Sequence, residues 1–167
     1  MKKAVSFVLL MLFITSSCRI SYTFHSASIN YNLTPTISID HFVNQAPLVY
    51  APLESQFNEG LLDIFTRRTR LQIIPNSEHM SLEGEIIAWQ LTPLAVQEDA
   101  FAAETRLTMS VRIRFNNYVT DEEITQTVSA NRTFDASLML DQVQGVYAAE
   151  MISEIVDQIF NATMANW

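Results

Sequence analysis

The stretch ETRLTMSVRIRFNN, residues 104–117, decides the fold because its side chains alternate between apolar and polar. Apolar residues occupy every second position: Leu107, Met109, Val111, Ile113 and Phe115. Successive side chains of a β-strand point to opposite faces of the sheet, so this pattern predicts a long strand with one buried face. The opposite face would carry Arg106, Arg112 and Arg114.

The segments on either side of this strand predict two further long strands. Residues 82–96 precede it, with Gly84 and Pro93 as irregular points, and residues 124–134 follow it after the turn sequence NNYVTDEE. Consecutive strands joined by such polar connections are typical of an antiparallel meander. Toward the N-terminus, TISIDHFV (36–43) and LQIIP (71–75) predict two shorter strands.

Two other segments have the spacing of amphipathic helices. From Leu53 to about Arg68, apolar residues recur three or four positions apart, and Pro52 suits the first helical turn. A second such stripe runs from about Leu138 to Met164. The order strand, helix, short strand, meander and long helix predicts an α+β two-layer sandwich. Its two helices would pack on one face of a mixed, largely antiparallel sheet of roughly four strands.

The first 17 residues have the features of a lipoprotein signal peptide. Lys2 and Lys3 precede an apolar run at 4–14, which is shorter than the roughly 20 residues of a membrane-spanning helix. Small residues follow, and Cys18, the only cysteine, comes directly after them. A bacterial lipobox has this arrangement, so we expect cleavage before Cys18 and acylation of its thiol. The alternative is an ordinary signal peptide with a cysteine nearby by chance.

Acylation of Cys18 would anchor the domain to a membrane. One acyl chain holds a protein only marginally, whereas two or more hold it stably. The expected organisation is therefore a signal peptide at 1–17, a lipidated leader at 18–35 and a single α+β domain at 36–167.

The chain is acidic, with a formal net charge of −8 at pH 7. Both lysines lie in the predicted signal peptide, so the mature chain would carry eight arginines against 18 acidic residues, a net charge of about −10. This balance argues against nucleic acid as a partner, because nucleic acid binds to basic surfaces.

The sequence contains no recognisable catalytic or metal-binding motif. His25, His41 and His79 lack the spacing of metal ligands, and three glycines are too few for a glycine-rich phosphate loop. We therefore expect a protein that is not an enzyme and that has no cofactor and no metal.

The best candidate for a binding surface is the row Arg106, Arg112 and Arg114, which Arg132 on the next strand could join. Guanidinium groups bind phosphate through paired, charge-assisted hydrogen bonds. In an envelope lipoprotein the abundant phosphorylated amphiphile is lipopolysaccharide (LPS), so LPS is the expected anion. The alternative is an ordinary solvated face, on which acidic residues of neighbouring strands neutralise the arginines.

Four stretches make the sequence resemble the LptE family of LPS-assembly lipoproteins, in the branch found in Bacteroidetes-type bacteria. They are the continuous segment 36–74, LEGEIIAWQLTPLAV (82–96), ETRLTMSVRIRFNN (104–117) and EIVDQIFNATMANW (154–167). The resemblance implies an outer-membrane lipoprotein, not an enzyme, with two helices on a four-stranded sheet. Such a protein plugs the β-barrel translocon LptD, helps to assemble it and helps to deliver LPS to the outer leaflet.

The resemblance leaves the LPS-binding residues open, because the basic residues of the better-known branch have no counterparts that match by motif. Arg19 follows Cys18, where an aspartate would signal retention in the inner membrane. By resemblance to sorting signals, the expected location is the outer membrane, on its periplasmic side or inside the barrel lumen. The alternative function is a stand-alone outer-membrane lipoprotein that binds an anionic lipid or glycan.

Overall fold

A computed structural model of the protein describes residues 29–94 and 103–164. The predicted signal peptide and the predicted acylation site, Cys18, lie outside these ranges. The described part contains eight elements, in this order: β1 (Thr36–Ile39), β2 (Val43–Asn44), α2 (Leu53–Arg68), β3 (Gln72–Ile73), β4 (Met80–Leu94), β5 (Glu104–Asn117), β6 (Glu122–Asp135) and α3 (Leu140–Met164).

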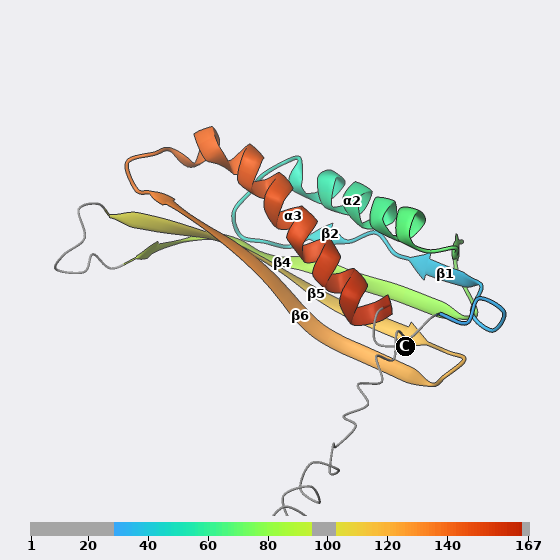
Figure 1. The fold of residues 1–167 in the computed structure, drawn as a ribbon. Coiled ribbons are helices and arrows are strands. Elements are labelled where there is room, and N and C mark those ends of the chain that lie inside the picture. The colour runs from blue at the N-terminus through green and yellow to red at the C-terminus, as the bar shows by residue number, and fades with distance from the viewer. Residues whose placement is uncertain (1–28, 95–102, 165–167) are drawn as a thin grey trace, which may run out of the picture.

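The six strands form one mixed sheet, in the order β3-β1-β4-β5-β6, with β2 also paired to β4 (Figure 1). Strands β4, β5 and β6 form the predicted antiparallel meander, whereas β1 and β2 run parallel to successive parts of β4. The α+β two-layer prediction is confirmed. The sheet has six strands rather than about four for two reasons: the short segment at 71–75 joins the sheet as β3, and the chain leaves the sheet after Ile39 and returns as β2.

The meander keeps one apolar face along its whole length, although β4 is irregular. The five apolar residues of β5 are all fully buried, as the alternation predicts. On β4 a bulge between Ile86 and Ala88 shifts the register by one residue. Since one extra residue reverses which side chains face inward, the bulge returns Trp89 to the core side, where it is fully buried.

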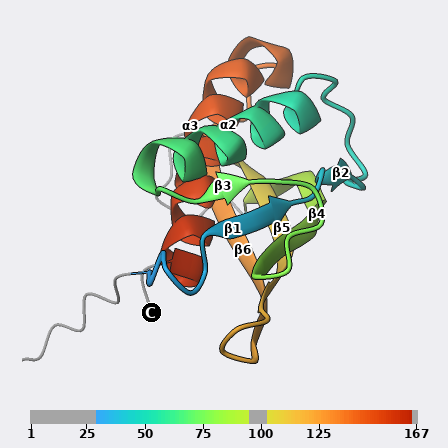
Figure 2. The same cartoon turned by 90° about the vertical axis from the view of Figure 1, so that its right-hand side faces the viewer.

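Both helices cover the same face of the sheet, and α2 lies beside α3 (Figure 2). Helix α2 buries Leu53, Phe57, Leu61, Ile64 and Phe65. A salt bridge between Arg68 and Asp157, with a nitrogen–oxygen distance of 2.8 Å, joins the two helices near their C-terminal ends. Of the helices in the described ranges, none is both long enough and apolar enough to span a membrane.

The connection between β1 and β2 is held against the start of α2. Phe42, which is fully buried, packs over Gly84 of β4. The side-chain amide of Asn58 accepts a hydrogen bond from the Phe42 N–H at 2.9 Å and donates one to the Phe42 carbonyl at 3.0 Å. The Glu54 carboxylate accepts a hydrogen bond from the Asn44 N–H at 2.8 Å. These bonds satisfy backbone N–H and carbonyl groups in a segment where the chain leaves the sheet.

Candidate functional site

The outer face of the sheet, on the side opposite the helices, carries the predicted arginine row. Arg112 stands opposite Glu85 in the β4–β5 register, and its guanidinium lies 2.8 Å from the Glu85 carboxylate. Arg114 stands opposite Glu83 and lies 3.2 Å from its carboxylate. The Glu123 carboxylate of β6 lies 3.8 Å from the other side of Arg114. Residues of opposite charge that face each other on neighbouring strands stabilise the sheet.

This arrangement neutralises both arginines within the sheet. Their side chains remain 55% and 58% exposed, so water still screens each ion pair. The charged residues around the adjoining open depression of about 390 Å³ include more acids than arginines: Asp40, His41, Glu83, Glu85, Arg112 and Arg114. The arrangement is the solvated, neutralised face that was the alternative expectation, and an anion would meet guanidinium groups whose charge neighbouring carboxylates already offset.

Arg106 lies apart from the other two arginines. It is six residues from Arg112 along β5, or roughly 20 Å at the rise of a strand. Its neighbours across the sheet are Thr92 on β4 and Thr133 on β6. Within the described ranges no acidic residue forms a salt bridge with it. Arg106 is exposed and differs from Arg112 and Arg114, which are both paired.

The expectation that Arg132 joins this row is wrong. In the β5–β6 register Arg132 stands opposite Leu107, whose side chain is buried on the helix-covered face. Arg132 therefore points to α3, where its guanidinium lies 2.8 Å from the Glu150 carboxylate and 3.0 Å from that of Glu154. The hydrogen bonds to Glu150 and Glu154 raise the pKa of Arg132. Arg132 thus ties β6 to α3.

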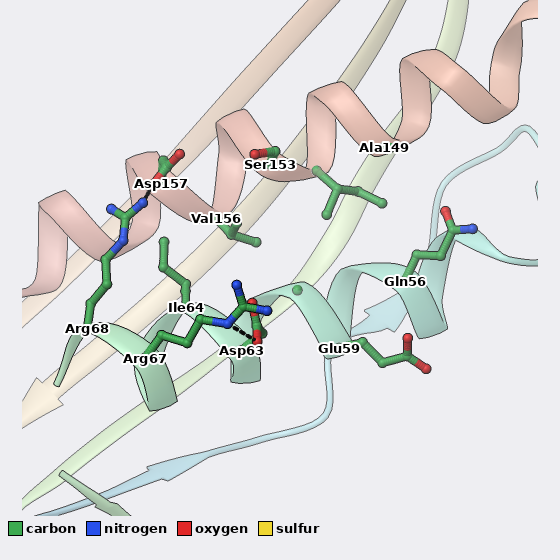
Figure 3. Close-up of a pocket in the computed structure, with 12 residues that line it drawn as sticks. Gln56, Glu59, Asp63, Ile64, Arg67, Arg68, Ala149, Ser153, Val156 and Asp157 are labelled. Carbon is green, nitrogen blue, oxygen red and sulfur yellow. Dashed lines mark ion pairs between the residues drawn. The ribbon is translucent and has the colours of Figure 1, made fainter. Parts of the chain in front are cut away.

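A second depression lies between α2 and α3 on the side away from the sheet (Figure 3), and sequence reasoning missed it. It is an open groove of about 680 Å³. Gly60 lets the helices approach closely, since a Cβ atom there would lie 3.3 Å from Ile152. Two ion pairs, Arg67 with Asp63 and Arg68 with Asp157, line one end. The small residues Gly60, Ala149 and Ser153 were the available signal, because they recur on facing sides of the helices.

The described residues contain no group of three or more histidine, cysteine, aspartate or glutamate side chains that could hold a metal ion. The shifted carboxyl pKa values belong to surface hydrogen bonds. The hydrogen bond from His41, followed by that from the Asn44 N–H, lowers the pKa of Glu54, and Ser137 lowers that of Asp135.

The geometry therefore defines an elongated α+β domain (Figure 1) that presents open, polar surfaces, and the two depressions described above are open to solvent. Residues 34–163 match the model of the LptE family, which is described as lipopolysaccharide-assembly. The chain belongs to this family, as the resemblance predicted. No match to this chain was found among the curated proteins.

Solved structures with the same fold include bacterial lipoproteins. A minor lipoprotein from Acinetobacter baumannii aligns with a TM-score of 0.51 at 15% identity, covering 79% of this chain and 94% of that one. The rare lipoprotein B from Shewanella oneidensis aligns with a TM-score of 0.53 at 13% identity, over 76% of this chain and 92% of that one. A hypothetical protein from Chlamydia trachomatis aligns with a TM-score of 0.53 at 11% identity, over 80% and 99%. At these identities the likeness shows a common fold.

Proposed function

We propose that the protein is a non-catalytic, lipid-anchored subunit of the LPS translocon in the outer membrane. It plugs the lumen of an LptD-type β-barrel, helps the barrel to assemble and helps to deliver LPS to the outer leaflet. The observation that carries this proposal is the family match, which spans 34–163 and thus nearly all of the described domain.

The outer face of the sheet suits a plug in a water-filled lumen. Its charges are arranged as neighbouring pairs, Arg112 with Glu85 and Arg114 with Glu83, so the face is polar without a strong field of one sign. Such a face stays hydrated when the lumen is wet and adds little electrostatic cost when a polar wall approaches it. The anchor at Cys18 would keep the domain at the membrane that holds the barrel.

A mild-detergent pull-down of the tagged chain, expressed with its native N-terminus, tests the proposal. We expect a large β-barrel protein to be recovered at about one copy per copy of the tagged chain, as mass spectrometry would quantify. Recovery of the tagged chain alone in several detergents would reject the plug function. It would favour the alternative, a stand-alone lipoprotein that binds an anionic lipid or glycan.

The anchor is tested separately with Cys18→Ser. The native chain should incorporate a radiolabelled fatty acid such as palmitate, and the variant should not. Labelling of both chains would show that the acyl group is attached elsewhere.

A second candidate role is direct contact between LPS phosphates and the outward arginines. Arg106 favours it most, because no salt bridge within the described ranges occupies its guanidinium, whereas Arg112 and Arg114 are paired. Replacing Arg106 by glutamine should weaken binding of purified LPS more than the same change at Arg112. Equal affinities for LPS in the two variants would remove Arg106 from this role.

A further inference from the structure

The two edges of the sheet are built differently. One edge consists of the short strands β3, β1 and β2, which contain two, four and two residues, and β4 carries Pro93 beyond β2. Short strands and proline prevent an edge from pairing with another chain. The other edge is β6, with 14 residues, no proline and no lysine. Its register with β5 continues from Glu122 to Asp135 without a bulge.

The free backbone groups of β6 can be assigned from the ladder. The Ala136 N–H donates to the Ala103 carbonyl across the β5–β6 pair, so even-numbered residues of β6 bond to β5. Because the backbone groups alternate in direction along an antiparallel strand, the odd-numbered residues present theirs to the free edge. Two side-chain contacts agree, since the carbonyls of Ser129 and Asn131 accept hydrogen bonds from the side chains of Gln158 and Arg132.

Apart from these two side-chain contacts, the centre of this edge lacks the usual protection against pairing. Residues 125–131, TQTVSAN, are uncharged. Among the described strands β6 pairs with β5 alone, and Figure 1 shows it along the open border of the sheet, with α3 above it. A long, regular and uncharged edge is a template on which an extended segment can add a strand.

The charges around the edge define what such a segment must contain. Six carboxylates and two guanidinium groups lie around it: Asp121, Glu122, Glu123, Asp135, Glu150, Glu154, Arg114 and Arg132. Arg114 pairs with Glu123, and Arg132 with Glu150 and Glu154, so the acids remain in excess. On α3, Glu150, Glu154 and Gln158 lie on one side of the helix, four residues apart, above the position of an added strand. Lysine or arginine on the helix-facing side of that strand would complement them. A second copy of this chain would bring acidic residues to an acidic edge.

We infer that the free edge of β6 binds an extended, basic segment of the barrel partner as an additional strand of the sheet. The inference rests on the proposed function for the source of the segment and adds the surface that holds it. The backbone groups of Thr125 and Thr127 and the N–H of Ser129, whose carbonyl already accepts from Gln158, supply the affinity. The two carboxylates of α3 share the single guanidinium of Arg132, and their excess negative charge selects the basic side chains.

The test places a photo-crosslinking amino acid at Asn131 in the full chain with its native N-terminus, in cells that contain the barrel. Two substitutions are compared in this background, Thr127→Pro and Thr127→Val. Thr127 directs its N–H to the free edge, so proline there removes a donor to the partner and leaves the ladder to β5 intact. Valine keeps the N–H and the β-branched shape, and equal thermal unfolding midpoints would show that both variants are folded.

We expect Asn131 to crosslink to one extended, lysine- or arginine-containing segment of the barrel protein. Thr127→Pro should lower the crosslinking yield by about fivefold or more, the effect of one lost hydrogen bond, and Thr127→Val should leave the yield unchanged.

If the barrel co-purifies but the crosslinking yield is the same in both variants, or if no crosslink forms, the edge inference is wrong and the proposed function stands. A crosslink to a second copy or to residues 19–28 of the same chain would also overturn it. If no barrel co-purifies, the proposed function fails, and a proline-sensitive crosslink to a basic segment of another protein would support the edge alone.

Discussion

Replacing Gly84 by alanine places a methyl group where the structure has no room. A Cβ atom at this position would lie 2.3 Å from the Phe42 ring and 2.3 Å from the carbonyl oxygen of Arg112. Both distances are far below van der Waals contact, so one of the two neighbours must move. The carbonyl belongs to the β4–β5 ladder, and Phe42 is fully buried. The substitution therefore disturbs either the sheet or the core.

The expected loss of stability follows from the cost of moving Phe42. Overpacking a filled core costs about 1–3 kcal/mol. Complete loss of a buried phenylalanine costs about 3–5 kcal/mol, and Phe42 would lose part of this burial. We expect Gly84→Ala to lower the free energy of unfolding by about 3 kcal/mol. In a domain of this size that corresponds to a fall in Tm of about 6–12 °C.

The assay is urea unfolding of the purified chain in detergent, followed by circular dichroism, with a matched substitution as control. At Gly145 of α3, an added Cβ atom meets only the Tyr50 hydroxyl, at 3.7 Å. Alanine is preferred over glycine inside a helix by about 0.5–1 kcal/mol, so Gly145→Ala should stabilise the protein. Replacing glycine by alanine should thus lower the free energy of unfolding at position 84 and raise it at position 145.

If the free energy of unfolding of Gly84→Ala lies within about 0.5 kcal/mol of the parent protein's, this reasoning is refuted, because substitutions at the surface have effects of that size. A double-mutant cycle with Phe42→Ala locates the strain. If the methyl group collides with the Phe42 ring, the double variant should lose less stability than the sum of the single losses. Additive losses would place the collision at the backbone of Arg112 instead.

Three further predictions concern polar contacts. Asn58→Ala should lower the free energy of unfolding by about 1–3 kcal/mol in urea titration, since two backbone groups of the β1–β2 connection lose their partner; an unchanged midpoint would show that water replaces the amide. The hydrogen bond from His41 lowers the pKa of Glu54, so its stabilisation is present above the ordinary carboxyl pKa and is lost as pH falls below it. Between about pH 5 and pH 3, Glu54→Gln should therefore lose less stability than the parent protein, and parallel stability–pH curves would contradict this. Replacing Arg112 and Arg114 together by alanine should weaken binding of purified LPS less than about tenfold, because both are exposed and already paired; a hundredfold loss in a binding titration would contradict this.

Local periodicity in the sequence was enough to locate the main elements. The predicted helix from Leu53 to about Arg68 has the observed bounds of α2. The strand read from the alternation at 105–115 extends by only one or two residues at each end in β5. These patterns can be recognised because side-chain direction repeats every two residues in a strand and every 3.6 residues in a helix. Burial of one face therefore produces a regular spacing of apolar residues along the chain.

The arginines show where such reasoning stops. Alternation within β5 correctly placed Arg106, Arg112 and Arg114 on one face. It could not place Arg132 relative to them, since that depends on the register between β5 and β6. A shift of one residue would have brought Arg132 to the outer face. The registers that pair Arg112 with Glu85 and Arg114 with Glu83 likewise join residues that are distant in the sequence.

The sequence by itself determined the α+β class, the order of the long elements and the buried face of β5, because these depend on neighbours along the chain. The tertiary structure alone decided the bulge that turns Trp89 inward, the packing of Phe42 over Gly84 and the free edge of β6. Each of these depends on strand pairing and close packing between distant segments. Such contacts are selected by the free energy of the whole assembled core, which no local pattern of residues records.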